Sequence, residues 1–215
     1  EAHSHSWFGE LDEADLLLAA AEKRIQSEIS APDARSMQGY LAFVRSRVTA
    51  MRGDIHRAIQ LCLAAHASFD AGDLALQLDT GMTLGYEYFI AGDYGTAGPI
   101  LHETIRLGIT AGSILNTVPT YCVMARLAGV QGLLSKSYAL YQAAAQFVAK
   151  ASGQHLGAQA LIEVGFADVL CEWNDLDGAL VHLKKGLDLM PWWGKADDFI
   201  LAYITMARIH LAHAN

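Results

Sequence analysis

The chain has 215 residues, 53% apolar and 18% charged, a composition that predicts a folded domain with a sizeable core and excludes a disordered segment. Its 15 basic and 23 acidic residues give a formal net charge of −8, which argues against nucleic acid as a partner of this segment. The 3 cysteines are scattered and form no CxxC motif, which argues against a disulfide framework or a zinc site and favours a reducing, cytoplasmic compartment.

Helices are expected along the whole chain, because its Ala- and Leu-rich segments of about 16 to 20 residues are too long for strands. We expect these segments to lack internal proline. The most apolar stretch, residues 118–134, contains polar residues and is shorter than the roughly 20 residues that cross a bilayer, so no membrane span is expected. In chain order, the predicted helices cover 10–29, 34–51, 55–71, 74–91, 94–111, 114–130, 134–151, 154–172, 176–189 and 195–213.

Turn signals recur about every 40 residues, which is typical of a helical-repeat solenoid. The principal turn places Gly or Asn before an acidic and an apolar residue, and a second glycine-containing turn falls midway between two principal turns. Glycine suits the position after a helix, where a left-handed backbone is needed. The principal turns are Gly9-Glu10-Leu11, Gly53-Asp54-Ile55, Gly92-Asp93-Tyr94, Asn174-Asp175-Leu176 and the weaker Gly132-Leu133-Leu134. The midway turns are Ala71-Gly72-Asp73, Ala111-Gly112-Ser113, Ser152-Gly153-Gln154 and Trp193-Gly194-Lys195.

Small residues occupy fixed positions around each principal turn, as close packing between paired helices requires. Ala14, Ala58, Ala97, Ser137 and Ala179 follow the turns, and Ser46, Gly85, Ala125 and Ala167 precede them. These patterns predict an all-α fold: a right-handed superhelix of antiparallel helix pairs with turns near 9, 53, 92, 132, 174 and 214. We expect residues 1–215 to form a single helical-repeat domain and to be a fragment of a larger protein.

Two repeats carry a recognisable signature. The letters Leu84-Gly85, Tyr88, Gly92-Asp93-Tyr94 and Ala97 resemble a tetratricopeptide (TPR) repeat, as do Phe166-Ala167, Leu170, Asn174-Asp175-Leu176, Ala179 and Pro191. A period of about 40 residues in place of 34 departs from that repeat and resembles the variant repeats of MalT-like, ATP-dependent LuxR-type transcriptional regulators. The specific motif covers roughly residues 165–215, including Cys171-Glu172-Trp173, His182-Leu183, Gly186-Leu187, Trp193-Gly194 and Ala207-Arg208.

The resemblance implies a superhelical sensor that receives an inducer and supports self-association. In that family the sensor lies between an upstream nucleotide-binding module and a downstream helix-turn-helix. This sequence contains neither a GxxxxGK[ST] loop nor a basic recognition helix. Contacts with ATP and DNA are therefore expected only from modules outside this segment.

A ligand is expected in the concave groove, because the first helix of each pair lines the inner wall of such a superhelix. Counting back six, ten or three residues from the turns gives the candidate wall residues. They are Arg47, Tyr86, Arg126, Asp168, Arg208, Phe43, Met82 and Phe89. Guanidinium donors, a carboxylate and flat apolar faces suit a small polar metabolite, a sugar or a peptide. The alternative is that each arginine is merely solvated or paired with Asp168 or Glu172.

Catalysis is not expected, because no Ser/His/Asp spacing or GxSxG elbow suggests a triad, and no cofactor is predicted. His3 and His5 are interpreted as solvated side chains and not as metal ligands. The predicted function is effector sensing and self-association, with a TPR-type scaffold for a protein or peptide partner as the alternative. Tyr203, Ile204 and Met206 of the last helix are expected to lack a partner helix and to allow pairing of two copies.

Overall fold

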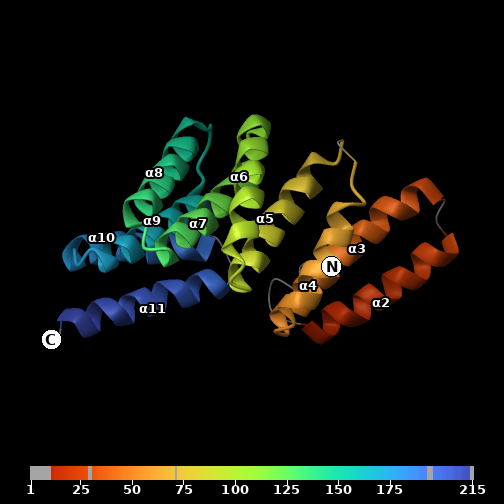
Figure 1. Cartoon of the computed structure of the whole chain (residues 1–215), viewed down its shortest axis with the longest axis horizontal. Helices are drawn as coiled ribbons and strands as arrows, with labels where there is room; N and C mark the ends of the chain where they lie inside the picture. Colours follow the sequence, from red (N-terminus) through yellow and green to blue (C-terminus); the bar gives the residue numbers. More distant parts are fainter. Residues whose placement is uncertain (1–10, 29–30, 71, 193–195, 214–215) are drawn as a thin grey trace. The chain divides into compact units, whose positions relative to one another are not determined.

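The computed structural model describes residues 11–28, 31–70, 72–192 and 196–213, and all its secondary structure is helical (Figure 1). These residues form ten α-helices and one 3-10 helix and contain no strand. The α-helices are α2 (Leu11–Glu28), α3 (Ala31–Met51), α4 (Ile55–His66), α5 (Leu74–Ile90), α6 (Tyr94–Ala111), α7 (Ile114–Val130), α8 (Leu134–Lys150), α9 (Leu156–Glu172), α10 (Leu176–Leu189) and α11 (Ala196–His213). The predicted all-α repeat fold is confirmed.

The chain divides into two compact units, an N-terminal lobe of residues 1–100 and a C-terminal lobe of residues 101–215. In the N-terminal lobe, α3 packs against α2, α4 and α5. In the C-terminal lobe, α9 packs against α7, α8, α10 and α11. The single domain over residues 1–215 stays a prediction, and its turns near 9 and 214 lie outside the described residues, as do His3 and His5.

The principal turns are built as the sequence indicates. The backbone is left-handed at Gly53, with φ of 92°, and at Asn174, with φ of 60°. Glycine meets this requirement without strain, and asparagine is the side chain that tolerates it best. The acid that follows caps the next helix: Asp54, Asp93 and Asp175 each accept a backbone N–H hydrogen bond of 3.0–3.1 Å from three residues further on.

The small residues beside these turns are buried where paired helices approach most closely. Ala14, Ala58, Ala97 and Ala179 are 0% exposed, as are Ser46, Ala125 and Ala167, while Ser137 is 1% exposed. A methyl group added at Gly186 of α10 would lie 2.8 Å from a methyl carbon of Val164 on α9. Larger side chains at these positions would force the helices apart.

Two expectations about the helices are wrong. Helices α6 and α7 contain Pro99 and Pro119, although proline-free segments were expected. Each proline removes one backbone donor, and burial of Pro119 in the C-terminal lobe shows that packing holds α7 across the missing bond. Helix α4 ends at His66, earlier than the predicted end at 71, and just beyond its end Ser68 Oγ donates to the Ala65 carbonyl at 2.6 Å. Phe69 then enters the core, where it is 6% exposed.

Candidate functional site

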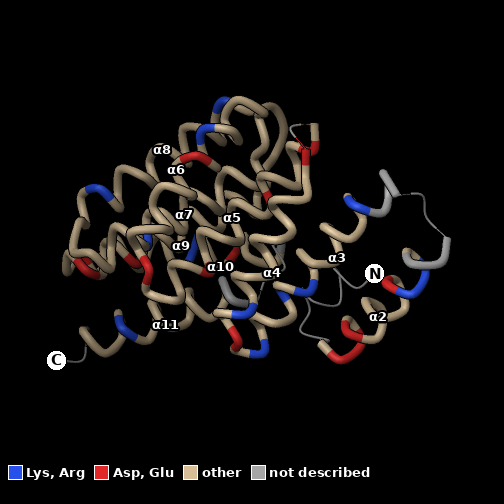
Figure 2. Tube along the Cα trace, turned by 45° about the vertical axis from the view of Figure 1, so that its right-hand side comes forward, with Lys and Arg blue, Asp and Glu red and all other residues tan. Residues whose placement is uncertain are grey.

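The first helices of the pairs are α3, α5, α7, α9 and α11, and they carry the eight predicted groove residues. The row counted six residues back from each turn is half-buried throughout, so its side chains reach both the protein interior and solvent. This row consists of Arg47, Tyr86, Arg126, Asp168 and Arg208. Figure 2 shows acidic and basic residues interspersed along the described trace.

In the C-terminal lobe, the row forms a charged cluster across successive first helices. Arg208 of α11 donates from Nη1 to Asp168 Oδ1 of α9 at 2.9 Å and from Nη2 to Glu172. The hydroxyl of Thr205 lies 3.4 Å from the same Asp168 oxygen. Arg126 of α7 also acts electrostatically on Asp168. Arg208 is therefore paired with Asp168 and Glu172, as the alternative interpretation of these arginines expected, and Arg126 lies near enough to act on the same carboxylate.

Burial sets the electrostatics of this cluster. Desolvation raises the pKa of Asp168, although attraction to Arg208 opposes the shift. Burial also raises the pKa of the Cys171 thiol, so this cysteine is not an activated nucleophile. The cluster combines half-buried guanidinium groups with the half-buried carboxylate of Asp168 and the exposed one of Glu172, and such an arrangement can recognise a polar ligand by charge-assisted hydrogen bonds.

In the N-terminal lobe, two of the predicted aromatic residues do not line a wall. Phe43 is 1% exposed and lies in a core cluster with Ile59 and Cys62. Phe89 is 8% exposed, and its ring centroid lies 6.5 Å from that of Tyr86 and 5.9 Å from that of Tyr94. Their rings are buried because these positions face neighbouring helices, which is a correction to the predicted solvent-facing groove.

The other predicted residues of this lobe remain half-buried. Arg47 lies on α3, while Met82 and Tyr86 lie on α5. All three belong to the N-terminal lobe, whereas the charged cluster belongs to the C-terminal lobe.

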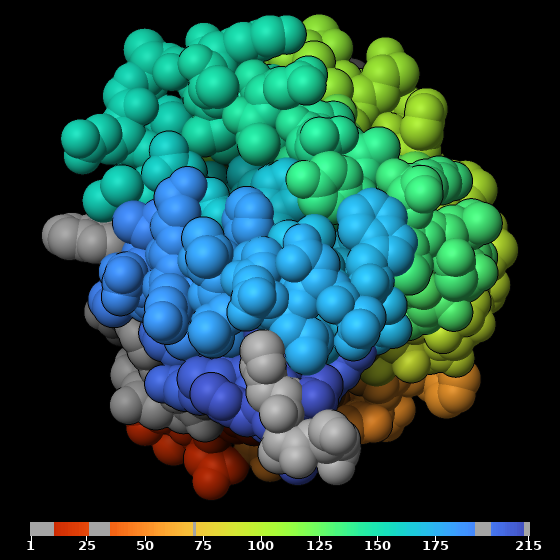
Figure 3. Space-filling view, turned by 90° about the vertical axis from the view of Figure 1, so that its left-hand side faces the viewer, coloured from red at the N-terminus to blue at the C-terminus, as the bar shows by residue number. Residues whose placement is uncertain are grey.

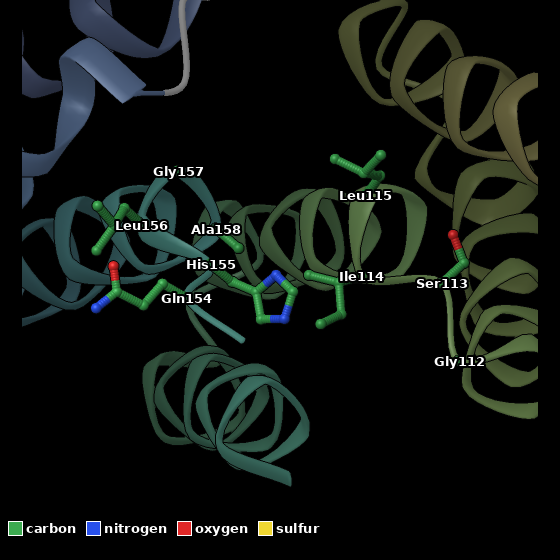
Figure 4. A pocket seen from close by; sticks show the side chains of 9 residues that line it. All are labelled: Gly112, Ser113, Ile114, Leu115, Gln154, His155, Leu156, Gly157 and Ala158. Carbon is green, nitrogen blue, oxygen red and sulfur yellow. The ribbon is translucent and has the colours of Figure 1, made fainter. Parts of the chain in front are cut away.

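Sequence reasoning missed a cavity of about 640 Å³ in the C-terminal lobe. The turns before α7 and α9 and the first residues of these two helices form it, and Figure 4 shows their side chains around it. Leu115 is 75% exposed there, while His155 Nε2 lies 3.0 Å from the Ser152 carbonyl oxygen. The signal available in the sequence is the pair of midway turns at Gly112 and Gly153. The lining residues are Gly112, Ser113, Ile114, Leu115, Gln154, His155, Leu156, Gly157 and Ala158.

A buried acid on α9 was also missed. Glu163 is 8% exposed and lies 2.6 Å from His182 Nδ1 of α10, while Lys185 donates to its other carboxylate oxygen. The ring of Phe166 lies 5.2 Å from that of His182. These contacts attach α10 to α9 and satisfy both oxygens of the acid.

Within the described ranges, no group of three or more His, Cys, Asp or Glu residues is placed to hold a metal ion. None of the described helices combines the length and hydropathy that crossing a bilayer requires. The three cysteines are free thiols.

Two solved structures resemble this fold over most of the chain. The nearly identical TPR-like repeats of a putative kinesin light chain from Podosopora anserina have a TM-score of 0.59 at 16% identity, covering 87% of this chain and 90% of that chain. A single-substitution variant of those repeats has a TM-score of 0.61, with the same identity and coverage. At this identity the likeness establishes the TPR-like fold alone. None of the curated proteins matches the chain.

The sequence itself matches a family model over most of its length. That family is described as the MalT-like TPR region, and the match covers residues 39–215. It includes α4 to α11 completely and most of α3. The chain therefore belongs to the family of MalT-like TPR regions.

Proposed function

We propose that this chain is the effector-sensing and self-association module of a MalT-like, LuxR-type transcriptional regulator in the cytoplasm, and that it is non-catalytic. The observation that carries the proposal is the half-buried network of Asp168 with Arg208 and Arg126. Membership of the MalT-like TPR family supports the regulator context. An effector bound there shifts the protein between resting and self-associating forms by its differential affinity for the two.

The test is a thermal-shift screen of the purified chain against sugars, sugar phosphates and amino acids, followed by calorimetry on any hit. A ligand at a hundred times its Kd stabilises the folded state by about 2.7 kcal/mol. Replacing Arg126→Ala should weaken binding at least about tenfold, because a charge-assisted hydrogen bond contributes roughly 1.5 to 3 kcal/mol.

The matched control is Arg106→Ala on α6. Arg106 pairs with Glu103 through an exposed contact and lies outside the predicted row. Equal affinity of the Arg126→Ala variant and the wild type for a confirmed effector would contradict the assignment of the site.

For self-association, the surface we favour is an apolar stripe on α11. Ile200, Tyr203, Ile204 and Leu211 are 57%, 54%, 52% and 67% exposed, and their spacing places them on one helix face. Met206, predicted with them, instead packs against the core of the C-terminal lobe. Figure 3 shows the side of this lobe on which α10 lies beside α11.

The repeat indicates what covers the stripe. At the same distances from the turn near 174, the matching positions on α9 are Ala160, Glu163, Val164 and Cys171. Ala160 and Val164 are 0–1% exposed and pack in one cluster with Ala179 and Leu183 of α10, and Cys171 packs against that cluster. Glu163 is bonded to His182 and Lys185 of α10. A helix from a second copy can occupy the equivalent face of α11 in the same way. Replacing Ile204→Glu should abolish dimers in sedimentation equilibrium, while Val181→Glu, at a 68% exposed position on α10, should leave them intact.

The alternative is a TPR-type scaffold that binds a protein or peptide segment. The open cavity before α7 and α9, with Leu115 at its rim, favours this possibility. Calorimetry separates the two functions, because a sensor binds a metabolite at 1:1 stoichiometry, whereas a scaffold binds only an extended peptide.

A further inference from the structure

Glu87 breaks the pattern of its own repeat. Counting back five residues from the principal turns gives a row of core positions on the first helices. Apart from Glu87 these are aliphatic: Val48, Leu127, Val169 and, at the same spacing, Ile209. All are buried, at 0–6% exposed, and Glu87 on α5 is 2% exposed. One repeat thus places a carboxyl group where the others place a hydrocarbon.

The carboxyl group of Glu87 is not satisfied by its neighbours. Neither of its oxygens has a hydrogen-bond partner among the described residues, and the hydroxyl of Thr83, one turn earlier on α5, has none either. Thr83 is 6% exposed. A buried polar group without a partner is costly, so this seam between α5 and its neighbours is held less firmly than the aliphatic equivalents.

The charged and titratable groups around Glu87 come from two neighbouring helices. Arg47 of α3 attracts its carboxylate, and Cys62 of α4 interacts electrostatically with it. Burial raises the pKa of Glu87 from 4.5 to about 8, with Arg47 opposing the shift. Burial and Glu87 together also raise the pKa of the Cys62 thiol, which therefore stays neutral.

We propose that Glu87 is a proton-uptake switch in the seam where α5 packs against α3 and α4, so that a neutral carboxyl group closes the seam and an ionised one loosens it. An ionised carboxylate must regain water, which requires α5 to move away from the apolar residues around it. In the proposed sensor, pH acting at this seam is then a second signal beside the effector. Only this link to sensing rests on the proposed function. The switch itself is a property of the N-terminal lobe.

The sign of the pH dependence follows from the direction of the shift. The folded state binds a proton at Glu87 that the unfolded chain has already released above pH 4.5. The stability contributed by this proton uptake at Glu87 is therefore fully present below pH 4.5 and is lost as pH rises through about 8. Over this interval the folding equilibrium constant should fall by up to about tenfold for each pH unit.

The experiment measures urea unfolding of the full chain between pH 5 and pH 9. Glu87→Gln should remove this slope, and Glu87→Leu should remove it and raise stability, because leucine restores the aliphatic row. Glu13→Gln, at an exposed position on α2, is the matched control and should keep the wild-type slope. An unchanged slope in Glu87→Gln would overturn the proposal.

A second readout reports on the seam itself. Cys62 is 0% exposed, so its labelling by a thiol reagent requires local opening. In a background with Cys122→Ser and Cys171→Ser, Cys62 should be labelled several-fold faster at pH 8.5 in the wild type than with Glu87→Gln. Removing the negative charge would by itself favour the thiolate, so slower labelling of the variant cannot arise from thiol chemistry.

Equal labelling rates would overturn the proposal even if the stability slope were present. Both measurements are made without an effector. A failed effector screen therefore contradicts only the proposed function, and a failed switch leaves the test at Arg126 untouched.

Discussion

Two acids buried on first helices have opposite surroundings in the two lobes. Glu163 of α9 is 8% exposed, and its oxygens meet His182 and Lys185 of α10. Glu87 of α5 is 2% exposed, and its oxygens meet no hydrogen-bond donor among the described residues. Burial alone therefore does not decide the role of an acid. The partners on the adjacent helix do, because an unpaired buried group carries the full cost of lost hydration.

A shift of one position along a first helix is enough to change an acid from enclosed and unpaired to accessible and paired. Asp168 lies one position earlier in its repeat than Glu87 does, in the half-buried row, and it accepts a hydrogen bond from Arg208 at 2.9 Å. One residue along a helix rotates a side chain by about 100°. That rotation separates an accessible ion pair from an acid enclosed among aliphatic positions.

The largest expected effect comes from replacing each buried acid by leucine at pH 8. Glu87→Leu should raise the free energy of unfolding by about 2 to 3 kcal/mol, because it removes an unsatisfied group and adds apolar burial. Glu163→Leu should lower it by about 1 to 2 kcal/mol, because its hydrogen bonds to the partly exposed His182 and Lys185 are lost, while the leucine adds apolar burial that offsets part of the loss. Urea denaturation of both variants checks the prediction. Shifts of the same sign would show that the two acids are equivalent.

A somewhat smaller effect is expected at Gly165, the position of α9 that matches Thr83 of α5 in the repeat. A methyl group added at Gly165 would lie 2.0 Å from the ring of Tyr141, which is 1% exposed and cannot move aside. Gly165→Ala should therefore cost about 1 to 3 kcal/mol through overpacking. Gly98→Ala on α6 has no neighbour within 4 Å, so this control should be neutral or slightly stabilising. Equal thermal midpoints of the two variants would contradict the close approach of α8 and α9.

The sequence was sufficient for the repeats because each repeat uses the same local chemistry. A left-handed glycine or asparagine followed by a capping acid is visible in the letters at Gly53-Asp54, Gly92-Asp93 and Asn174-Asp175, and the structure contains all three turns. The row of half-buried side chains follows from the same register, so Arg126, Asp168 and Arg208 could be found by counting.

What could not be predicted depends on which neighbouring helix a side chain faces. Phe43 and Phe89 are in register with the inner wall but turn into the core. Glu87 is the one acid in a row of otherwise aliphatic positions, which the sequence does show. That its oxygens have no hydrogen-bond partner depends on residues of α3 and α4 that are distant in sequence. The cavity before α7 and α9 forms only when two midway turns come together.

The smallest effect is expected from changing the residue that caps a helix at a principal turn. The turn before α8 has Leu133 where three other turns have a capping aspartate, and no side chain caps this helix. Leu133 is 48% exposed, so replacing it removes little packing. Leu133→Asp should therefore stabilise the C-terminal lobe by about 0.5 to 1 kcal/mol through a new cap at the positive end of α8. Asp175→Ala, at the capped turn before α10, should lose about the same amount, and thermal unfolding measures both changes. The contrary result is no gain from Leu133→Asp although Asp175→Ala loses stability. That result would mean that Leu133 stabilises its turn by packing against the first turn of α8, as an apolar residue before a helix can.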